Sequence, residues 1–343
     1  MLRLLLVAGC LGLGGPGHAE PETLSLLAFG DTGKPVSWPT TFVPQYRVGE
    51  AMAREDRRAP VDALLLLGDI FYPDGLTRRT LRDRMRMNLA GPYCHFLSLT
   101  QKGRQAARSH CDRDPEQTHP VPILAVTGNH DLGRGQGVRL QRERLPVFLE
   151  NWLMPADARS YELGAGLSVI GFHSDYVKKG MPATALAEAL RESKGPWRIV
   201  IAHHPIADPG KGWDSAYAQR VRDAIAAAGH PVHLFLAGHE HSLQALRAGG
   251  AALHVVSGAG GAGVRPITPT RVERLYGEAL HGFVRLHVSP EALDVTFLAL
   301  DGTFDRDAEP RARFRVAPDG TVTGDLRGPA DAGRAAGRAG ARR

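Results

Sequence analysis

The chain has 343 residues, 43% of them hydrophobic and 23% charged, which is the composition of a soluble globular protein with enough apolar material for one large core. The net charge of +6 suggests nucleic-acid binding, but residues 327–343 contribute +4 and the first nineteen residues contribute +1. The rest of the chain is therefore nearly neutral, and its charge gives no support to specific nucleic-acid binding. The Gly/Ala/Arg-rich residues 327–343 are predicted to form a disordered tail.

The N-terminus has the pattern of a secretory signal peptide. Arg3 precedes the apolar segment Leu4–Leu13, and Gly17-His18-Ala19 provides small residues for cleavage before Glu20. The apolar segment is too short to span a bilayer, so we expect no transmembrane segment. Residues 1–19 are therefore predicted to be a signal peptide of a secreted or periplasmic protein. An alternative is a lipoprotein acylated at Cys10, although this would leave a very short signal.

The remaining sequence alternates between strand-like and helix-like segments. Short apolar runs bounded by glycine or polar residues predict seven strands, at Leu24–Phe29, Asp62–Leu67, Pro122–Thr127, Leu167–Phe172, Arg198–Ala202, Val232–Ala237 and Leu253–Ser257. Helical spacing of Ala, Leu and charged residues predicts helices at Gln45–Arg57, Ala183–Arg191 and Ser215–Ala228. Strands that are apolar on both faces indicate an α/β protein whose sheets are covered on both sides.

Two further segments have distinct signals. Phe283–Val288 and Leu293–Leu300 flank Ser289-Pro290-Glu291 and predict an antiparallel hairpin, and Arg313–Val316 predicts another edge strand. Residues 76–119 lack strand signals and are predicted to be a helical insertion near the rim of the active site. This insertion contains Cys94 and Cys111, the even pair left after signal removal, which we expect to form a disulfide in an oxidising compartment. The alternative is two unrelated buried thiols.

Polar residues follow five of the predicted strands directly. The strand ends lead into Gly30-Asp31-Thr32-Gly33, Gly68-Asp69-Ile70-Phe71-Tyr72, Gly128-Asn129-His130-Asp131, His203-His204-Pro205 and Gly238-His239-Glu240-His241. In open α/β sheets, ligands bind at the carboxyl ends of the strands. Each motif alone has a structural explanation, such as a turn or a helix cap. All five together, in order and at strand ends, instead indicate a metal site built from carboxylates and imidazoles.

The residue types suit a site for two metal ions. A glycine before a ligand permits a sharp turn and a close approach of the backbone to an ion. A carboxylate has two oxygens and can bridge two cations about 3.5–4 Å apart. Two imidazoles separated by one residue, as in His239 and His241, can reach neighbouring ions from one loop.

The order GD-x-G, GD-x-x-Y, GNHD, H-x-P and GH-x-H resembles that of the calcineurin-like metallophosphoesterases. Tyr72, three residues after Asp69 in GDIFYPDG, is similar to the purple acid phosphatases, especially the single-domain, tartrate-resistant type. The resemblance runs from about Leu24 to Val316, although the insertion, the tail and the segment 172–175 depart from the pattern. It implies a four-layer α/β/β/α sandwich with two mixed β-sheets and one catalytic domain over residues 20–326.

The resemblance also implies a role for each matched residue. A ferric ion would be held by Asp31, Tyr72 and His241, and Asp69 would bridge it to a divalent ion (Fe, Zn or Mn) held by Asn129, His203 and His239. His203 takes this role rather than His204 because it stands two residues before Pro205. His130 would contact the substrate phosphate and protonate the leaving alcohol. Asp131 would orient His130.

The resemblance implies a phosphatase that hydrolyses phosphomonoesters by attack of a metal-bound hydroxide, with an acidic optimum and without a covalent phospho-enzyme. We expect a small phosphorylated substrate, no specific nucleic acid and a monomeric chain. A phosphodiesterase or nucleotidase of the same superfamily is the nearest alternative. Alternatives of another class are a redox role for the iron pair and a non-catalytic protein that binds metal or phosphate.

Two sets of residues are weaker candidates for contact with the substrate. His173, His204, Asp208 and Lys211 lie on loops that can reach the pocket, although a single polar loop residue is usually just solvated. Five arginines between Arg78 and Arg86 could attract phosphate, although a solvated helix face is the simpler interpretation.

Overall fold

The structure is a computed structural model, and it describes residues 22–34, 43–111, 115–133, 135–210, 213–301 and 307–326. The predicted signal peptide and the predicted tail after Arg327 lie outside these residues. Among the helices of the described residues, none combines the length and the apolar character needed to cross a membrane.

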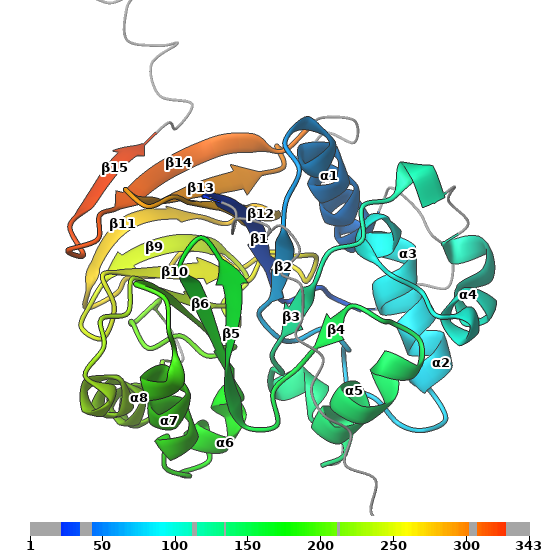
Figure 1. The fold of residues 1–343 in the computed structure, drawn as a ribbon, viewed down its shortest axis with the longest axis horizontal. Coiled ribbons are helices and arrows are strands. Elements are labelled where there is room, and N and C mark those ends of the chain that lie inside the picture. The colour runs from blue at the N-terminus through cyan, green and yellow to red at the C-terminus, as the bar shows by residue number, and fades with distance from the viewer. Residues whose placement is uncertain are drawn as a thin grey trace, which may run out of the picture.

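Fifteen strands form two mixed sheets within the described residues (Figure 1). The first sheet has eight strands in the order β15 (Val322–Leu326), β14 (Glu309–Val316), β13 (Leu293–Ala299), β12 (Gly282–Val288), β1 (Leu24–Phe29), β2 (Ala63–Leu66), β3 (Ile123–Ala125) and β4 (Trp152–Leu153). The second has seven in the order β11 (Glu273–Glu278), β9 (Leu243–Arg247), β10 (Leu253–Ser257), β8 (Leu234–Ala237), β7 (Trp197–Ile201), β6 (Leu167–Phe172) and β5 (Ala158–Gly164). Strands β1–β4 are parallel to one another, as are β6, β7, β8 and β10.

Helices cover part of the outer face of each sheet. Beside β1–β4 lie α1 (Pro44–Arg58), α2 (Leu81–Arg84), a π-helix (Met85–Ala90), α3 (Gly91–Tyr93), α4 (Gln101–Ala107) and α5 (Gly137–Arg144). The second sheet carries α6 (Ser174–Lys178), α7 (Thr184–Glu192) and α8 (Ser215–Ala228). The short 3₁₀ turns are Cys94–Phe96, Arg108–His110, Pro115–Gln117, Asn129–Asp131 and Leu145–Val147.

The alternation of side chains along β1 shows how the layers are held together. Leu27 and Phe29 pack in the core beneath α1, whereas Leu26 and Ala28 pack in the core between the two sheets. A third core joins the second sheet to α7 and α8. Because successive residues of a strand face opposite sides, a strand that is apolar throughout requires a partner layer on each side. The predicted four-layer α/β/β/α sandwich is confirmed.

The described part of the insertion over residues 76–119 is mainly helical, as predicted, and Cys94 forms the predicted disulfide with Cys111. The prediction of Arg313–Val316 as an edge strand is wrong in its position. This segment belongs to β14, which pairs with β13 on one side and with β15 on the other. The hairpin of β12 and β13 is confirmed.

Candidate metal centre

The five polar motifs converge where the two sheets meet. Asp31 follows β1, Asp69 and Tyr72 follow β2, and Asn129 follows β3, all in the first sheet. His203 follows β7, and His239 and His241 follow β8, in the second sheet. The loops are bonded together: Asp31 N donates to Gly68 O at 3.0 Å, and Gly238 N donates to His203 O at 3.0 Å. The parallel register thus places ligands from both sheets at one shared edge.

The first group of donor atoms surrounds the Tyr72 hydroxyl. This oxygen lies 3.2 Å from Asp31 Oδ1, 3.1 Å from Asp69 Oδ2 and 3.1 Å from His241 Nε2. His241 Nε2 is in turn 3.3 Å from Asp31 Oδ1. One hydroxyl hydrogen cannot satisfy three neighbours, so this arrangement leaves lone pairs facing each other.

The second group of donor atoms surrounds His203 Nε2. This nitrogen lies 3.3 Å from Asp69 Oδ2, 3.2 Å from Asn129 Oδ1 and 3.2 Å from His239 Nδ1. His239 Nδ1 is also 3.1 Å from Asn129 Oδ1. The same atom, Asp69 Oδ2, therefore belongs to both groups, which is the position of a bridging ligand.

The hydrogen bonds behind the imidazoles fix which nitrogen points into the centre. His203 Nδ1 donates to Leu67 O at 2.9 Å, and His241 Nδ1 donates to Gly263 O at 2.8 Å. With Nδ1 bonded behind the ring, Nε2 is the nitrogen of each ring that faces the carboxylates and that a cation would bind in place of a proton. Metal-ligating histidines typically donate their other N–H in this way. Atoms bound about 2.0–2.2 Å from one ion lie about 3 Å apart, so both groups have the chemistry and spacing of a cation site.

The pKa shifts in the centre also support a cation site. Burial alone would lower the pKa of His203, but the carboxylates of Asp69 and Asp31 outweigh burial and raise that pKa to about 10. Burial and the negative charges of Asp31 and Asp69 raise the pKa of the Tyr72 phenol. Burial and the positive charge of His203 lower the pKa of His239 to about 2. This concentration of negative charge away from water favours a bound cation.

The backbone is strained at three of the predicted ligands. Asp31, Asp69 and His239 have φ angles of 55°, 52° and 70°, in the left-handed region that non-glycine residues rarely adopt. Such a conformation costs on the order of 1–3 kcal/mol and often occurs at functional sites. The strain turns the side chains back toward the centre, where Asp31 Oδ2 accepts from His239 N at 2.7 Å.

Glycine is required at Gly128 because the backbone passes against the bridging carboxylate. A Cβ atom there would lie 2.2 Å from Asp69 Oδ1 and 2.7 Å from His203 Cε1. The resulting close approach lets His130 N donate to Asp69 Oδ1 at 2.8 Å, which leaves Asp69 Oδ2 for the two donor groups.

His130 lies beside a cavity at the edge of the centre. Its ring stacks on Tyr72, with centroids 4.3 Å apart, and its Nδ1 donates to Pro73 O at 2.7 Å. The cavity has a volume of about 690 Å³ and is lined by Asn129, His130, Asp74, Thr77, Thr80 and Arg84, among others. Arg84 is therefore the member of the arginine-rich segment that lines this cavity, and its guanidinium donates to the carbonyl of Tyr72.

The predicted role of Asp131 is wrong. Its Oδ1 accepts from Ile70 N at 3.0 Å and Phe71 N at 2.8 Å, and its Oδ2 accepts from Gly128 N at 2.9 Å. These bonds fasten the loop after β3 to the loop after β2, while the Pro73 carbonyl orients His130. Burial and the nearby Asp69 charge raise the pKa of Asp131 to about 7. Although Asp131 follows His130 directly in the sequence, this does not determine the direction of the Asp131 side chain.

The weaker candidates mostly have structural partners. His173 lies 2.9 Å from Thr127 Oγ1 and 3.0 Å from Pro155 O, and Asp208 accepts from the backbone of Gly210 and Arg271. His204 packs against the ring of His239, but its Nδ1 lies 2.9 Å from Ser174 Oγ. His203, by contrast, contacts both Asp69 and Asn129. Lys211 lies outside the described residues.

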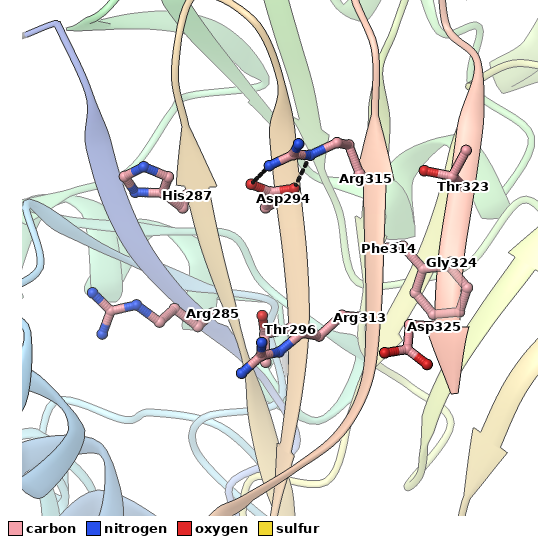
Figure 2. Close-up of a pocket in the computed structure, with 10 residues that line it drawn as sticks. All are labelled: Arg285, His287, Asp294, Thr296, Arg313, Phe314, Arg315, Thr323, Gly324 and Asp325. Carbon is pink, nitrogen blue, oxygen red and sulfur yellow. Dashed lines mark hydrogen bonds and ion pairs between the residues drawn. The ribbon is translucent and has the colours of Figure 1, made fainter. Parts of the chain in front are cut away.

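A second hollow of about 530 Å³ lies on the outer face of β12–β15 (Figure 2). Its lining includes Arg285, Arg313 and Asp294, and Arg315 binds Asp294 through two contacts of 2.7 and 2.8 Å. None of the predicted metal ligands or His130 lines it. These residues are the outward-facing side chains of an antiparallel sheet, so the hollow is separate from the metal centre.

Sequence reasoning missed Arg265, which lies on the loop after β10. Its guanidinium reaches His239 O and His241 Nε2, at 3.3 and 3.4 Å. A single arginine in a loop has no spacing or motif that would reveal this contact.

Comparison with known proteins identifies the family. Residues 24–243 match the calcineurin-like phosphoesterase family. Purple acid phosphatase 3 of Arabidopsis thaliana is 24% identical over 292 residues, which cover 82% of this chain and 75% of the relative. That likeness supports the predicted resemblance to purple acid phosphatases.

Two solved structures share the fold. Purple acid phosphatase PPD1 from yellow lupin (Lupinus luteus) seeds aligns with a TM-score of 0.59 at 17% identity, covering 88% of this chain and 55% of that one. GAP50, the anchor in the inner membrane complex of Plasmodium, aligns with a TM-score of 0.60 at 14% identity, covering 84% and 89%. The family match spans well over half of the sequence, and this chain therefore belongs to the calcineurin-like phosphoesterase family.

Proposed function

We propose that this protein is a binuclear metal-dependent phosphatase that hydrolyses phosphomonoesters. The observation that carries the proposal is the pair of donor groups that share Asp69 Oδ2. In both groups, atoms that can each bind a cation lie 3.1–3.3 Å apart, so the donors fit two cations held by one bridging carboxylate.

Each donor group suits a different ion. The phenol, carboxylate and imidazole of Asp31, Tyr72 and His241 would hold a ferric ion, and the amide and imidazoles of Asn129, His203 and His239 would hold a divalent Fe, Zn or Mn ion. When bound, the two ions would neutralise the phosphate oxygens and acidify the attacking water.

In this proposal His130 acts as the proton donor. Because its Nδ1 hydrogen is used by Pro73 O, the proton for the leaving oxygen must be carried on Nε2. The stack on Tyr72 fixes the ring beside both the centre and the cavity that would receive the leaving alcohol. A donor that must be protonated supports an acidic optimum.

We also propose that the protein is exported to a secreted or periplasmic location. The disulfide between Cys94 and Cys111 supports this proposal, since disulfides persist in oxidising compartments. The predicted signal peptide lies outside the described residues.

The test is a visible spectrum and a metal analysis of the same purified sample, with hydrolysis of an aryl phosphomonoester and an aryl phosphodiester measured alongside. We expect iron, a broad charge-transfer band and preferential hydrolysis of the monoester. Tyr72→Phe should abolish the band because it removes the phenolate. Tyr93→Phe is the matched control, since Tyr93 is also buried but lies in the core beneath α1. A colourless protein that holds only zinc or manganese would contradict the ferric site but not the two-metal hydrolase.

A further inference from the structure

Arg265 is joined to the metal centre by its backbone and by its side chain. Arg265 N donates to His241 O at 2.9 Å, and the carbonyl of nearby Gly263 accepts from His241 Nδ1. The side chain then reaches back, so that Nη1 donates to His239 O at 3.3 Å and Nη2 lies 3.4 Å from His241 Nε2. The position of this guanidinium is therefore fixed by the same loop that presents two of the proposed ligands. Arg265 lies beyond residues 24–243, which match the family.

The positive charge of Arg265 is only weakly balanced. Among the described residues it forms an ion pair with Glu240 Oε2, at 4.0 Å, and the arginine side chain is 50% exposed. The contacts with His239 and His241 involve one hydrogen of each Nη group at most. A guanidinium has five N–H donors. The contacts of Arg265 with the described residues therefore leave donors that can bind a ligand.

The position beside His241 Nε2 determines which ligand would fit. This nitrogen is the atom that faces Asp31 and Tyr72, so a cation bound there would lie close to the guanidinium. Two positive charges at this distance repel each other unless an anion lies between them. A phosphate group has the charge and the geometry to meet both, because a guanidinium binds two phosphate oxygens through parallel N–H bonds.

We propose that Arg265 is a substrate-binding residue that contacts a non-bridging oxygen of the phosphate held at the metal centre. This inference rests on the proposed function and adds a phosphate contact from the loop after β10. The side chain is half exposed, so a phosphate bound at the centre can reach it from the solvent.

The experiment measures the binding of inorganic phosphate to the metal-loaded protein by isothermal titration calorimetry, with metal content determined on each sample. Arg265→Gln should weaken phosphate binding about 10- to 100-fold at unchanged metal content, as expected for loss of a charged hydrogen-bonded contact. Arg265→Lys should recover part of the affinity, because it restores the charge without the planar fork. Arg247→Gln is the matched control: Arg247 on β9 is 49% exposed and pairs with Glu273, away from the metal ligands. It should bind phosphate as the wild type does.

Two results would overturn the inference. Phosphate affinity of Arg265→Gln equal to that of Arg247→Gln would show that Arg265 makes no contact. Loss of metal together with loss of phosphate binding would show that Arg265 only holds the segment His239–His241. Hydrolysis by the wild-type protein is scored separately: a protein that binds phosphate through Arg265 but cleaves no ester would refute the proposed function and leave this inference standing.

Discussion

Two groups of imidazole side chains, each arranged around a buried carboxylate, differ in how their atoms are paired. In the first, here called the Asp56 cluster, Asp56 of α1 accepts from Val61 N at 2.8 Å and lies 2.7 Å from His95 Nε2 and 3.0 Å from His119 Nδ1. Each of these three nitrogens contacts no acceptor other than the Asp56 carboxylate within the described residues. In the metal centre, by contrast, Asp69 Oδ2 faces a phenol and an imidazole that also face other acceptors.

Residue type alone therefore does not identify a metal site. The Asp56 cluster satisfies its own charge, and Asp56 lies within an ordinary helix. The atoms of the proposed metal centre are not paired in this way, and its backbone is strained at Asp31, Asp69 and His239. The pattern of hydrogen bonds and the backbone strain thus distinguish a cluster that stabilises the fold from a cluster suited to binding an ion.

The sharpest test of this difference is Asp69→Asn. Because the variant removes the charge of the shared ligand, we expect it to lose bound metal and to lower kcat by on the order of 10³-fold or more, comparable to or greater than the loss of one electrostatic contact to a transition state. Metal content by mass spectrometry and steady-state phosphatase kinetics provide the measurement. A variant with two ions per chain and near-normal kcat would show that Asp69 is not the bridging ligand.

The matching change in the other region is Asp56→Asn. This variant replaces a buried carboxylate that receives three N–H groups, so we expect the free energy of unfolding to fall by about 1–3 kcal/mol. Metal content and kcat should stay at the wild-type level, because the Asp56 cluster takes no part in the centre. Urea unfolding followed by circular dichroism measures the change. If Asp56→Asn instead lost metal while keeping its stability, the distinction between the two regions would fail.

Much of the fold could be predicted because its central strands are apolar on both faces. The limits of β1, β6 and β10 match the predicted ones, since each is a short apolar run closed by glycine or polar residues. Strands β5, β11 and β15 were missed. All three are edge strands, and their polar residues interrupt the apolar pattern. Strand β9, Leu243–Arg247, has a composition equally suited to a helix.

The candidate site was predictable to the extent that its residues follow strands. Asp31, Asp69, Asn129, His203 and His239 all occupy that position, and parallel strands bring their ends together. The role of Asp131 and the presence of Arg265 were not predictable. Both depend on side-chain directions set by loop hydrogen bonds between segments distant in sequence, such as Asp131 with Phe71.

The smallest expected effect is the change, at acidic pH, in the free energy of unfolding that Asp56 contributes. Burial alone would raise the pKa of Asp56, but the hydrogen bonds from His95, Val61 and His119 lower it below its ordinary value of 3.8. A carboxylate with a lowered pKa in the folded state adds stability above pH 3.8, and this stability is lost as the pH falls through the folded-state pKa. The unfolding free energies of the wild type and Asp56→Asn should therefore converge below pH 3.8. Urea titrations of both proteins at several acidic pH values test this, and a gap that stays constant would mean that Asp56 acts through packing and not through its charge.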